Sequence, residues 1–420
     1  MIIQTADVII IVAYFFLLFL SIFWLIVLIS SKQENKDRLL QRHPIFTTII
    51  PAYNEDGSIK ETIASVLALD YPHDLLEIIV VNDGSADRTP EIVKEMIKAH
   101  PLRNIRLINQ KNGGKGNAMN AGLAVAKGEF FASLDADSFI SPEALKKMLP
   151  YFDENKNIAA VCPLLKIKKP SSILQKVQWY EYIINMLYKD LNAQLDCIHV
   201  TPGPFSVYRT KVIQDLGGYD EKTITEDLEI AIRLQKHHYK IVQTFDATVE
   251  TEPPNTWSSL FKQRIRWYKG SVDNSIAYRK LMFNKEYGDF GFIRMPTIIA
   301  SGAVAIILTL TIVQQFTVRI VNSFISLKAI DFDLLTLLKN YTFNLNILGL
   351  PFFKITVALT LITLSLFITI YSFKVVRERI TNHGRTWVSL LLYVSIYAFF
   401  ISFVWITIAF RYATKKTTKW

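Results

Sequence analysis

Acidic and aromatic side chains occur in short groups that are widely spaced along the chain. In chain order they are Tyr53 with Glu55, Asp83, Asp135 with Asp137, Glu226 with Asp227, and Gln263 with Arg266 and Trp267. Each group alone is a weak signal, because short acidic patterns arise by chance in most chains. Carboxylates at the ends of strands can together hold a divalent metal, a nucleotide and a reacting hydroxyl. The order of the groups therefore indicates sugar transfer from a nucleotide donor.

Asp135 and Asp137 are separated by one residue and directly follow a run that predicts a strand. Such a pair can direct hard oxygen ligands towards one Mg²⁺ or Mn²⁺, which would bridge the diphosphate of a sugar nucleotide. The alternative is a turn in which these aspartates cap a helix that opens near Ser141 and Pro142. For an isolated pair of this kind, the helix cap is the more common explanation.

A glycine-rich stretch at residues 112–117 follows another predicted strand and precedes a helical pattern at residues 118–126. Its glycines permit close approach of the backbone, and Lys115 can meet a phosphate or the nucleotide base. The stretch is not a Walker loop, because neither Ser nor Thr follows the lysine. An ordinary strand-to-helix turn is an equally good explanation.

Glu226 and Asp227 follow Thr225 and directly precede a helical pattern at residues 228–235. The simple explanation is a capping box at the start of that helix. The functional hypothesis makes Asp227 a general base that takes the proton of an acceptor hydroxyl. Glu226 is the alternative base.

Gln263, Arg266 and Trp267 lie at positions i, i+3 and i+4, so one helix face would present all three side chains. An indole offers a flat apolar surface to a sugar ring, and Arg266 can bond to a diphosphate. The alternative is an anchor at the lipid boundary.

Short β-branched runs alternate with amphipathic stretches in the region that carries these groups. Strands are predicted at residues 46–50, 76–81, 105–108 and 130–134, and helices at residues 58–69 and 89–99. This alternation predicts an α/β fold with a mostly parallel sheet and helices on both faces. Ligands of such sheets bind at the carboxyl ends of the strands, where Glu55, Asp83 and Asp135 are expected.

Four long apolar runs, at residues 8–30, 295–316, 355–373 and 386–410, contain no charged residue. Hydrophobic residues make up 50% of the chain and charged residues still make up 20%, so the apolar content is segregated. Each run approaches the about 20 residues that cross the core of a bilayer. No basic residue precedes the first run, which disfavours a cleaved signal peptide. The chain is expected to be a multi-pass membrane protein.

The net charge is +10, and basic residues gather beside the apolar runs. This distribution explains the charge, so a nucleic-acid partner is not expected. They are Lys32, Lys36, Arg38 and Arg42 after the first run, and Lys374, Arg377, Arg379 and Arg385 between the last two. This pattern fits the positive-inside rule and predicts that the region after Ser31 is cytoplasmic, at the plasma membrane. The basic carboxyl terminus conflicts with four spans, which leaves open a further span or a re-entrant segment within residues 321–351. Cys162 and Cys197 are expected to be packing residues.

Two further stretches have strong helical patterns. Residues 172–194 form an amphipathic pattern, which predicts either a surface helix that covers the sheet or a helix in the membrane interface. The aromatic residues Trp179, Tyr180 and Tyr182 favour the interfacial helix. Residues 255–270 mix aromatic and basic side chains and can also lie at the interface.

Taken together, residues 46–270 resemble the family-2 inverting glycosyltransferases with a GT-A fold. The resemblance is strongest to their membrane-embedded processive branch, which includes cellulose, hyaluronan, chitin and poly-N-acetylglucosamine synthases. It implies that Tyr53, Glu55, Asp83 and Lys115 hold the uridine part of the donor, that Asp135 contacts the nucleotide, and that Asp137 ligates the metal. It further implies that Asp227 is the base, and that Gln263, Arg266 and Trp267 close over the diphosphate and position the acceptor sugar.

The resemblance also suggests that residues 201–209 lie near the acceptor entrance. There Pro202 replaces the small polar residue that is usual in relatives, which puts fine acceptor specificity in doubt. The implied donor is a UDP-hexose or UDP-N-acetylglucosamine, and the implied reaction is a single inverting displacement that extends a β-linked polysaccharide. Movement of the product through the chain's own helices is expected, and an accessory membrane subunit remains open.

Two other functions compete with this hypothesis. One is the non-processive transfer of a single sugar to a lipid, and the other is a membrane scaffold or channel subunit that has lost activity. The expected domains are an N-terminal transmembrane helix at 1–31 and a cytoplasmic GT-A domain at 41–250. Interfacial helices with the Gln263, Arg266 and Trp267 motif follow at 251–294, and C-terminal transmembrane helices at 295–420.

Overall fold

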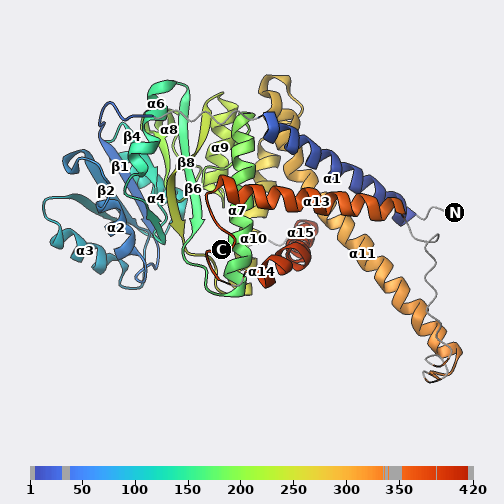
Figure 1. The fold of residues 1–420 in the computed structure, drawn as a ribbon. Helices are drawn as coiled ribbons and strands as arrows, with labels where there is room; N and C mark the ends of the chain where they lie inside the picture. The colour runs from blue at the N-terminus through green and yellow to red at the C-terminus, as the bar shows by residue number, and fades with distance from the viewer. Residues whose placement is uncertain are drawn as a thin grey trace. The chain divides into compact units, whose positions relative to one another are not determined.

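The computed structural model describes residues 5–30, 38–333, 352–384 and 386–414, together with the single residues 335 and 339. The chain forms two compact units. One consists of Ser31–Ile299 and Ser372–Tyr397 and contains the sheet, and the other consists of Met1–Ser30, Ala300–Tyr371 and Ala398–Trp420. Figure 1 shows the elements of both units.

The first unit is built on an eight-stranded sheet with the order β3-β2-β1-β4-β7-β6-β8-β5. Its strands are β1 (Phe46–Ala52), β2 (Leu76–Asn82), β3 (Asn104–Asn109), β4 (Phe130–Ser133), β5 (Ser138–Ile140), β6 (Ile158–Ile167), β7 (Ser206–Arg209) and β8 (Lys240–Thr251). Strands β3, β2, β1 and β4 are parallel, as are β6 and β8, whereas β7 and β5 run antiparallel to their neighbours. The predicted strands and the mostly parallel sheet are confirmed.

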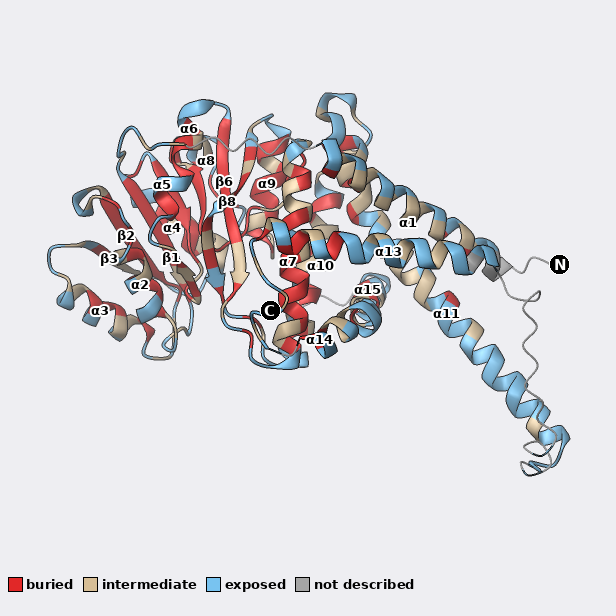
Figure 2. Cartoon of the chain, viewed as in Figure 1, coloured by how far each residue is buried: buried red, intermediate tan, exposed pale blue. Residues whose placement is uncertain are grey.

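Helices bury both faces of this sheet, and the alternation of side chains along the strands shows why. In β2, Ile78 and Val80 pack into one apolar cluster, and Ile79 and Val81 pack into another on the opposite face. A strand that is covered on both sides needs a continuous apolar run, which is the pattern that this region of the sequence contains. Figure 2 shows the central strands as mostly buried, whereas the edge strand β3 is largely not.

The first of these clusters contains side chains of α2 (Ile59–Leu67), α3 (Thr89–Ala99), α5 (Ala144–Met148) and α6 (Pro150–Glu154). The second contains side chains of α4 (Lys115–Val125), α8 (Thr210–Asp215) and α9 (Glu226–Lys236). Short helical turns are η1 (His73–Leu75), η2 (Arg279–Leu281), η3 (Lys285–Tyr287) and the π-helical turn η4 (Phe290–Arg294). The predicted helices are confirmed to within a few residues.

Helix α7 (Ile173–Gln194) covers the sheet, as one expectation for this stretch had it, but it is not a surface helix, because its other side is also covered. It begins with a capping box between Ser172 and Gln175. One side lies against β6 and β8, and the other is covered by α14 (Trp387–Leu392). The aromatic residues that suggested a membrane interface are buried here, and the Trp179 ring lies 5.1 Å from Phe373. Figure 2 shows α7 as a mostly buried helix.

Helix α10 (Trp257–Ala277) contains the stretch with mixed aromatic and basic residues. Thr256 and Ser259 form a capping box at its start, just after two prolines that cannot continue a strand ladder. Buried side chains along α10 include Leu260, Arg264 and Ile265. The helix is therefore packed into the first unit rather than lying loosely on it.

The second unit is helical and consists of α1 (Thr5–Ser30), most of α11 (Met295–Ala329) and α13 (Phe352–Val375), and α15 (Ala398–Ala413). Among the residues that the structure describes, four helical segments are long and apolar enough to cross a membrane: Val8–Ser30, Phe290–Ala329, Ile355–Val375 and Trp387–Ala413. They contain the four charge-free runs, and many of their apolar side chains are exposed, as lipid-facing residues would be. The open question of a further span falls on residues 321–351, most of which lie outside the described residues.

Candidate active site

The amine of Lys115 joins two carboxylates that come from different elements. Lys115 is the first residue of α4, and its Nζ lies 2.6 Å from Oδ1 of Asp135, which follows β4, and 2.7 Å from Oε1 of Glu226, the first residue of α9. Burial lowers the pKa of Lys115, but Asp135 and Glu226 outweigh it and the net shift is upwards. Lys115 is therefore a fixed cation at the carboxyl end of the sheet.

Asp137 is the partner of Asp135 in the acidic pair and forms no ion pair with any described residue. Its Oδ1 accepts a hydrogen bond from Ser138 Oγ at 3.1 Å. Burial, followed by the negative charges of Asp135 and Glu55, raises the pKa of Asp137 to about 7. Neither aspartate caps a helix, because α5 begins at Ala144 with Glu143 at its N-cap position. The helix-cap interpretation of this pair is therefore wrong.

The donor atoms at this end of the sheet fit a metal that is shared with a substrate. Within the described ranges, no group of three or more His, Cys, Asp or Glu side chains is arranged to hold a metal ion. Asp135 and Asp137 supply carboxylate oxygens only, and the Asp137 carboxylate is crowded by like charge. Mg²⁺ typically takes one or two carboxylates and completes its shell with water and phosphate oxygens. The acidic pair fits this kind of site better than a permanent metal cage.

Asp83 organises the glycine-rich loop. It follows β2 directly, and its Oδ1 accepts from Gln110 Nε2 at 2.7 Å and from the Gly113 amide at 2.9 Å. Its Oδ2 accepts from the amide of Gly114, also at 2.9 Å. Gly114 has a φ of +87°, a conformation that side chains rarely adopt, so glycine is required where the loop enters α4. Asp83 thereby sets the start of the helix that carries Lys115.

Tyr53 and Glu55 lie on the loop that follows β1. Tyr53 is 51% exposed, so its ring is available to a ligand. Glu55 is partly buried, and its Oε2 accepts from Ser58 Oγ at 2.7 Å. Burial raises the pKa of Glu55, and the charge of Asp135 adds to this shift, so the loop lies within electrostatic reach of the acidic pair.

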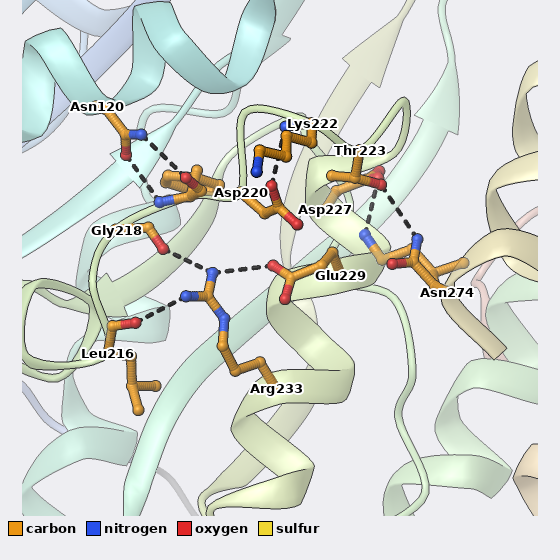
Figure 3. A network of polar contacts seen from close by, with 12 residues as sticks. Asn120, Leu216, Gly218, Asp220, Lys222, Thr223, Asp227, Glu229, Arg233 and Asn274 are labelled. Carbon is orange, nitrogen blue, oxygen red and sulfur yellow. Dashed lines mark hydrogen bonds and ion pairs between the residues drawn. The ribbon is translucent and has the colours of Figure 1, made fainter. Parts of the chain in front are cut away.

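The capping box predicted at the start of α9 is absent. The side chain of Thr225 makes no capping hydrogen bond. Its Oγ1 instead accepts from Asn274 Nδ2 of α10 at 3.1 Å, and a side chain at Gly270 would collide with Thr225. Helices α9 and α10 are thus joined closely at this point, and Asn274 also bonds to Thr223 (Figure 3).

Glu226 and Asp227 have different surroundings, which separates the two candidate bases. Glu226 is paired with Lys115, whereas Asp227 forms no ion pair within the part of the chain that the structure describes. The Oδ1 atom of Asp227 accepts only from the neighbouring Leu228 amide, at 2.9 Å. Burial, followed by the charge of Glu226, raises the pKa of Asp227 to about 6, although Lys115 and Arg266 oppose the shift. Asp227 is the carboxylate better suited to accept a proton near neutral pH.

A frame of polar contacts fixes α9 relative to α4. Arg233 donates to the carbonyls of Leu216 and Gly218 at 2.7 and 2.6 Å, and to Glu229 Oε2 at 2.9 Å. Asn120 of α4 bonds to both main-chain groups of Tyr219 in the same loop. Figure 3 shows that these contacts hold the segment before Asp227 between the two helices.

The three motif residues of α10 are held in different ways. Arg266 is exposed. Its positive charge lowers the pKa of Asp227, although burial raises that pKa by more. Arg266 therefore lies near the Asp227 carboxylate. Trp267 is partly buried, with the guanidinium carbon of Arg264 4.1 Å from the centre of its ring. Gln263 accepts a hydrogen bond from Arg264. The structure therefore brings Arg266 towards Asp227, while Arg264 supports the other two.

Three residues that matter here were not singled out from the sequence. Arg264 is completely buried, and it pairs with Glu181 of α7, which is also buried. The sequence offered one signal for these two residues: each is a charged residue inside a helical stretch that is rich in aromatic residues. The third is Gly203 in the segment near the predicted acceptor entrance, whose carbonyl accepts from Ser133 Oγ at 2.8 Å.

Comparison with known proteins agrees with this architecture. Residues 47–217 match the family "Glycosyl transferase family 2". Poly-beta-1,6-N-acetyl-D-glucosamine synthase of Staphylococcus epidermidis is 33% identical over 267 residues, and that of Staphylococcus aureus is 30% identical over the same length. Both matches cover 61% of this chain and 64% of the relative, so the chain matches less than two thirds of these relatives.

Among solved structures, a mannosyltransferase of Pyrobaculum calidifontis, in complex with GDP-Man and Mn²⁺, has the same fold. It aligns with a TM-score of 0.63 over 98% of this chain and 99% of its own, at 18% sequence identity. The match confirms the predicted fold class.

A side chain at position 203 should disturb the Lys115 bridge. A Cβ atom there would lie 2.6 Å from Lys115 Nζ and 2.8 Å from Asp135 Oδ2. We expect Gly203→Ala to lower the midpoint of thermal unfolding, with a cost of about 1–3 kcal/mol for overpacking. Gly57→Ala is the matched control, because a Cβ there has no neighbour within 4 Å. Identical behaviour of the two variants would contradict the close packing at Gly203.

Proposed function

We propose that the chain, whose residues 47–217 match the family "Glycosyl transferase family 2", is a membrane-embedded inverting glycosyltransferase that uses a UDP-sugar to extend a β-linked polysaccharide. The observation that carries this proposal is the Lys115 bridge. Lys115 pairs with both Asp135 and Glu226, and Asp227 is left as an unpaired carboxylate among the described residues of the site. The proposed donor is UDP-N-acetylglucosamine or a UDP-hexose, and the first is supported by the names of the two bacterial relatives.

The donor side of the proposed site lies at the carboxyl ends of β1, β2 and β4. We assign Tyr53, Glu55 and Asp83 to the uridine part, with the ring of Tyr53 exposed for stacking and Asp83 also holding the glycine-rich loop in place. Lys115 and Asp135 would contact the nucleotide. Asp137 would ligate Mg²⁺ or Mn²⁺, which when bound offsets negative charge on the leaving diphosphate.

The proposed chemical step is a single displacement with Asp227 as general base. Asp227 accepts the proton of an acceptor hydroxyl while that oxygen bonds to the anomeric carbon, and the bond from this carbon to the diphosphate breaks. UDP leaves from the opposite face, so the anomeric configuration inverts. Glu226 is unsuited to this role because Lys115 already neutralises it. Asp227 then returns its proton to the solvent.

The acceptor side of the proposed site is the face of α10 that carries Gln263, Arg266 and Trp267. Arg266 lies near Asp227 and is exposed, so it can bond to the diphosphate. The indole of Trp267 offers its face to an acceptor sugar. We assign residues 41–250 to the catalytic domain, facing the cytoplasm at the plasma membrane, and residues 251–294 to interfacial helices. The four candidate spans support coupling of synthesis to movement of the product across the bilayer, with or without an accessory subunit.

A comparison of different nucleotide-sugar donors tests the proposed function directly. The purified full chain, reconstituted in lipid with Mg²⁺ or Mn²⁺, should release UDP from UDP-N-acetylglucosamine faster than from UDP-glucose or UDP-glucuronate, and should build long products. A product limited to one added sugar would support transfer to a lipid instead. No UDP release from any of the three donors would overturn the enzymatic assignment.

Removing the negative charge of the base separates chemistry from binding. Asp227→Asn should reduce transfer by at least about a thousandfold, within the range of a lost general base and charge, while UDP affinity changes little. Rates come from UDP release and affinities from calorimetry. Glu226→Gln is the matched control at the adjacent position and should retain measurable turnover. Unchanged turnover in Asp227→Asn would remove this residue from the reaction.

The pH dependence of transfer follows from the same carboxylate. Burial raises the pKa of Asp227 to about 6, and only the deprotonated form can act as a base. The rate should therefore be maximal above pH 6 and fall as the pH drops through about 6. Glu226→Gln should move this midpoint to lower pH, because it removes a negative charge that raises the pKa of Asp227. A midpoint that moves with metal concentration would indicate Asp137 instead.

A further inference from the structure

A buried ion pair anchors α10 at a residue adjacent to the motif. The side chain of Arg264 is completely inaccessible, and that of Glu181 on α7 is 8% exposed. Nε of Arg264 donates to Oε1 of Glu181 at 3.2 Å, and its NH2 group donates to Oε2. Charges taken out of water need such partners, and loss of either one leaves the other buried and uncompensated. The pair therefore fixes α10 against α7.

Tyr397 adds a third member from a distant part of the chain. Its hydroxyl donates to Glu181 Oε2 at 2.7 Å and accepts from Arg264 Nε at 3.2 Å. Tyr397 ends the π-helical turn η6 (Tyr393–Tyr397), and the ring of Tyr393 stacks on both Tyr180 and Tyr397. The ion pair is thus connected to the segment Ser372–Tyr397, which belongs to the same compact unit.

Arg264 also touches two of the three motif residues. It donates to Oε1 of Gln263 and lies over the ring of Trp267, with 4.1 Å between the guanidinium carbon and the ring centre. A planar guanidinium can fork to a carboxylate and stack on an indole at the same time, whereas an ammonium group cannot. In the part of the chain that the structure describes, Arg264 bonds to Glu181, Tyr397 and Gln263 and stacks on Trp267, and it makes no hydrogen bond to Lys115, Asp135 or Asp227. The donor side therefore does not depend on it directly.

We propose that Arg264, held by Glu181 and Tyr397, is a positioning residue that sets Gln263 and Trp267 for the acceptor sugar. This inference rests on the proposed function, because it assigns these two residues to acceptor binding. Arg264 itself touches neither the donor nor the reacting atoms. Its role is to hold the indole face and the amide in one orientation, so that each new chain end is placed for the next addition.

The test compares acceptor and donor dependence in full-length variants. Arg264→Lys keeps the positive charge but loses the paired hydrogen bonds to Glu181 and the stacking on Trp267. Tyr397→Phe removes only the hydroxyl. The acceptor is polysaccharide made by the wild-type protein and fractionated by length. We expect the acceptor KM of Arg264→Lys to rise about tenfold or more, as for misplaced binding groups. The donor KM should stay within about twofold, and products should be shorter. Tyr397→Phe should show the same split to a smaller extent.

Glu378→Gln is the control for a merely structural effect. This variant removes the ion pair at 2.9 Å between Glu378 and Lys166, which ties the same Ser372–Tyr397 segment to β6. Glu378 also accepts from Asn382, so both of these contacts lie outside α10. This variant should leave the ratio of acceptor to donor KM and the product length unchanged. Equal changes of both KM values in Arg264→Lys, or the same split in Glu378→Gln, would overturn the positioning role. Absence of transfer by the wild-type chain would instead refute the proposed function.

Discussion

The ammonium group of Lys115 connects parts of the chain that are otherwise independent. Asp135 ends the parallel half of the sheet, and Glu226 opens a helix that lies about ninety residues further along. These three partly buried charges need one another as partners, because one cation lies between two carboxylates. This single bridge brings the carboxyl end of the sheet next to the start of α9, where Asp227 lies. Removing the cation would leave the neighbouring acids to repel one another, and β4 and α9 would lose their common contact.

The sheet and the positions of the acidic groups could be predicted from the sequence, because they follow from local patterns. Runs such as residues 76–81 bury both faces, and this pattern leads directly to parallel strands with Asp83 and Asp135 at one edge. The surroundings of α7 could not be predicted in this way. Its cover comes from residues after 372, and Glu181 pairs across 83 residues with Arg264 and across 216 with Tyr397. Periodicity reports which face is apolar, but it does not report what lies against that face.

The start of α9 illustrates a second limit. Thr225, Glu226 and Asp227 have the residue types of a helix start, and α9 does begin there, but the hydroxyl of Thr225 bonds to Asn274 rather than to its own helix. Competition between a local cap and a partner from another helix is decided by tertiary packing, here by the close approach of Gly270. As a result, α10 contacts α9 at one point and Glu181 at another. A shift of α10 would change both of these contacts.

The π-helical turn Tyr393–Tyr397 has a consequence for the phase of the last candidate span. A π turn contains one more residue than an α turn, and one residue corresponds to a rotation of about 100° around the helix axis. The boundary between the two compact units falls directly after this turn, between Tyr397 and Ala398. The extra residue therefore gives the helix two registers, a first one up to Tyr397 that brings its hydroxyl to Glu181 and a second one from Ala398 onwards. Insertions after Tyr397 would leave the first register intact, whereas a single insertion between Trp387 and Tyr397 would turn the hydroxyl away from its carboxylate.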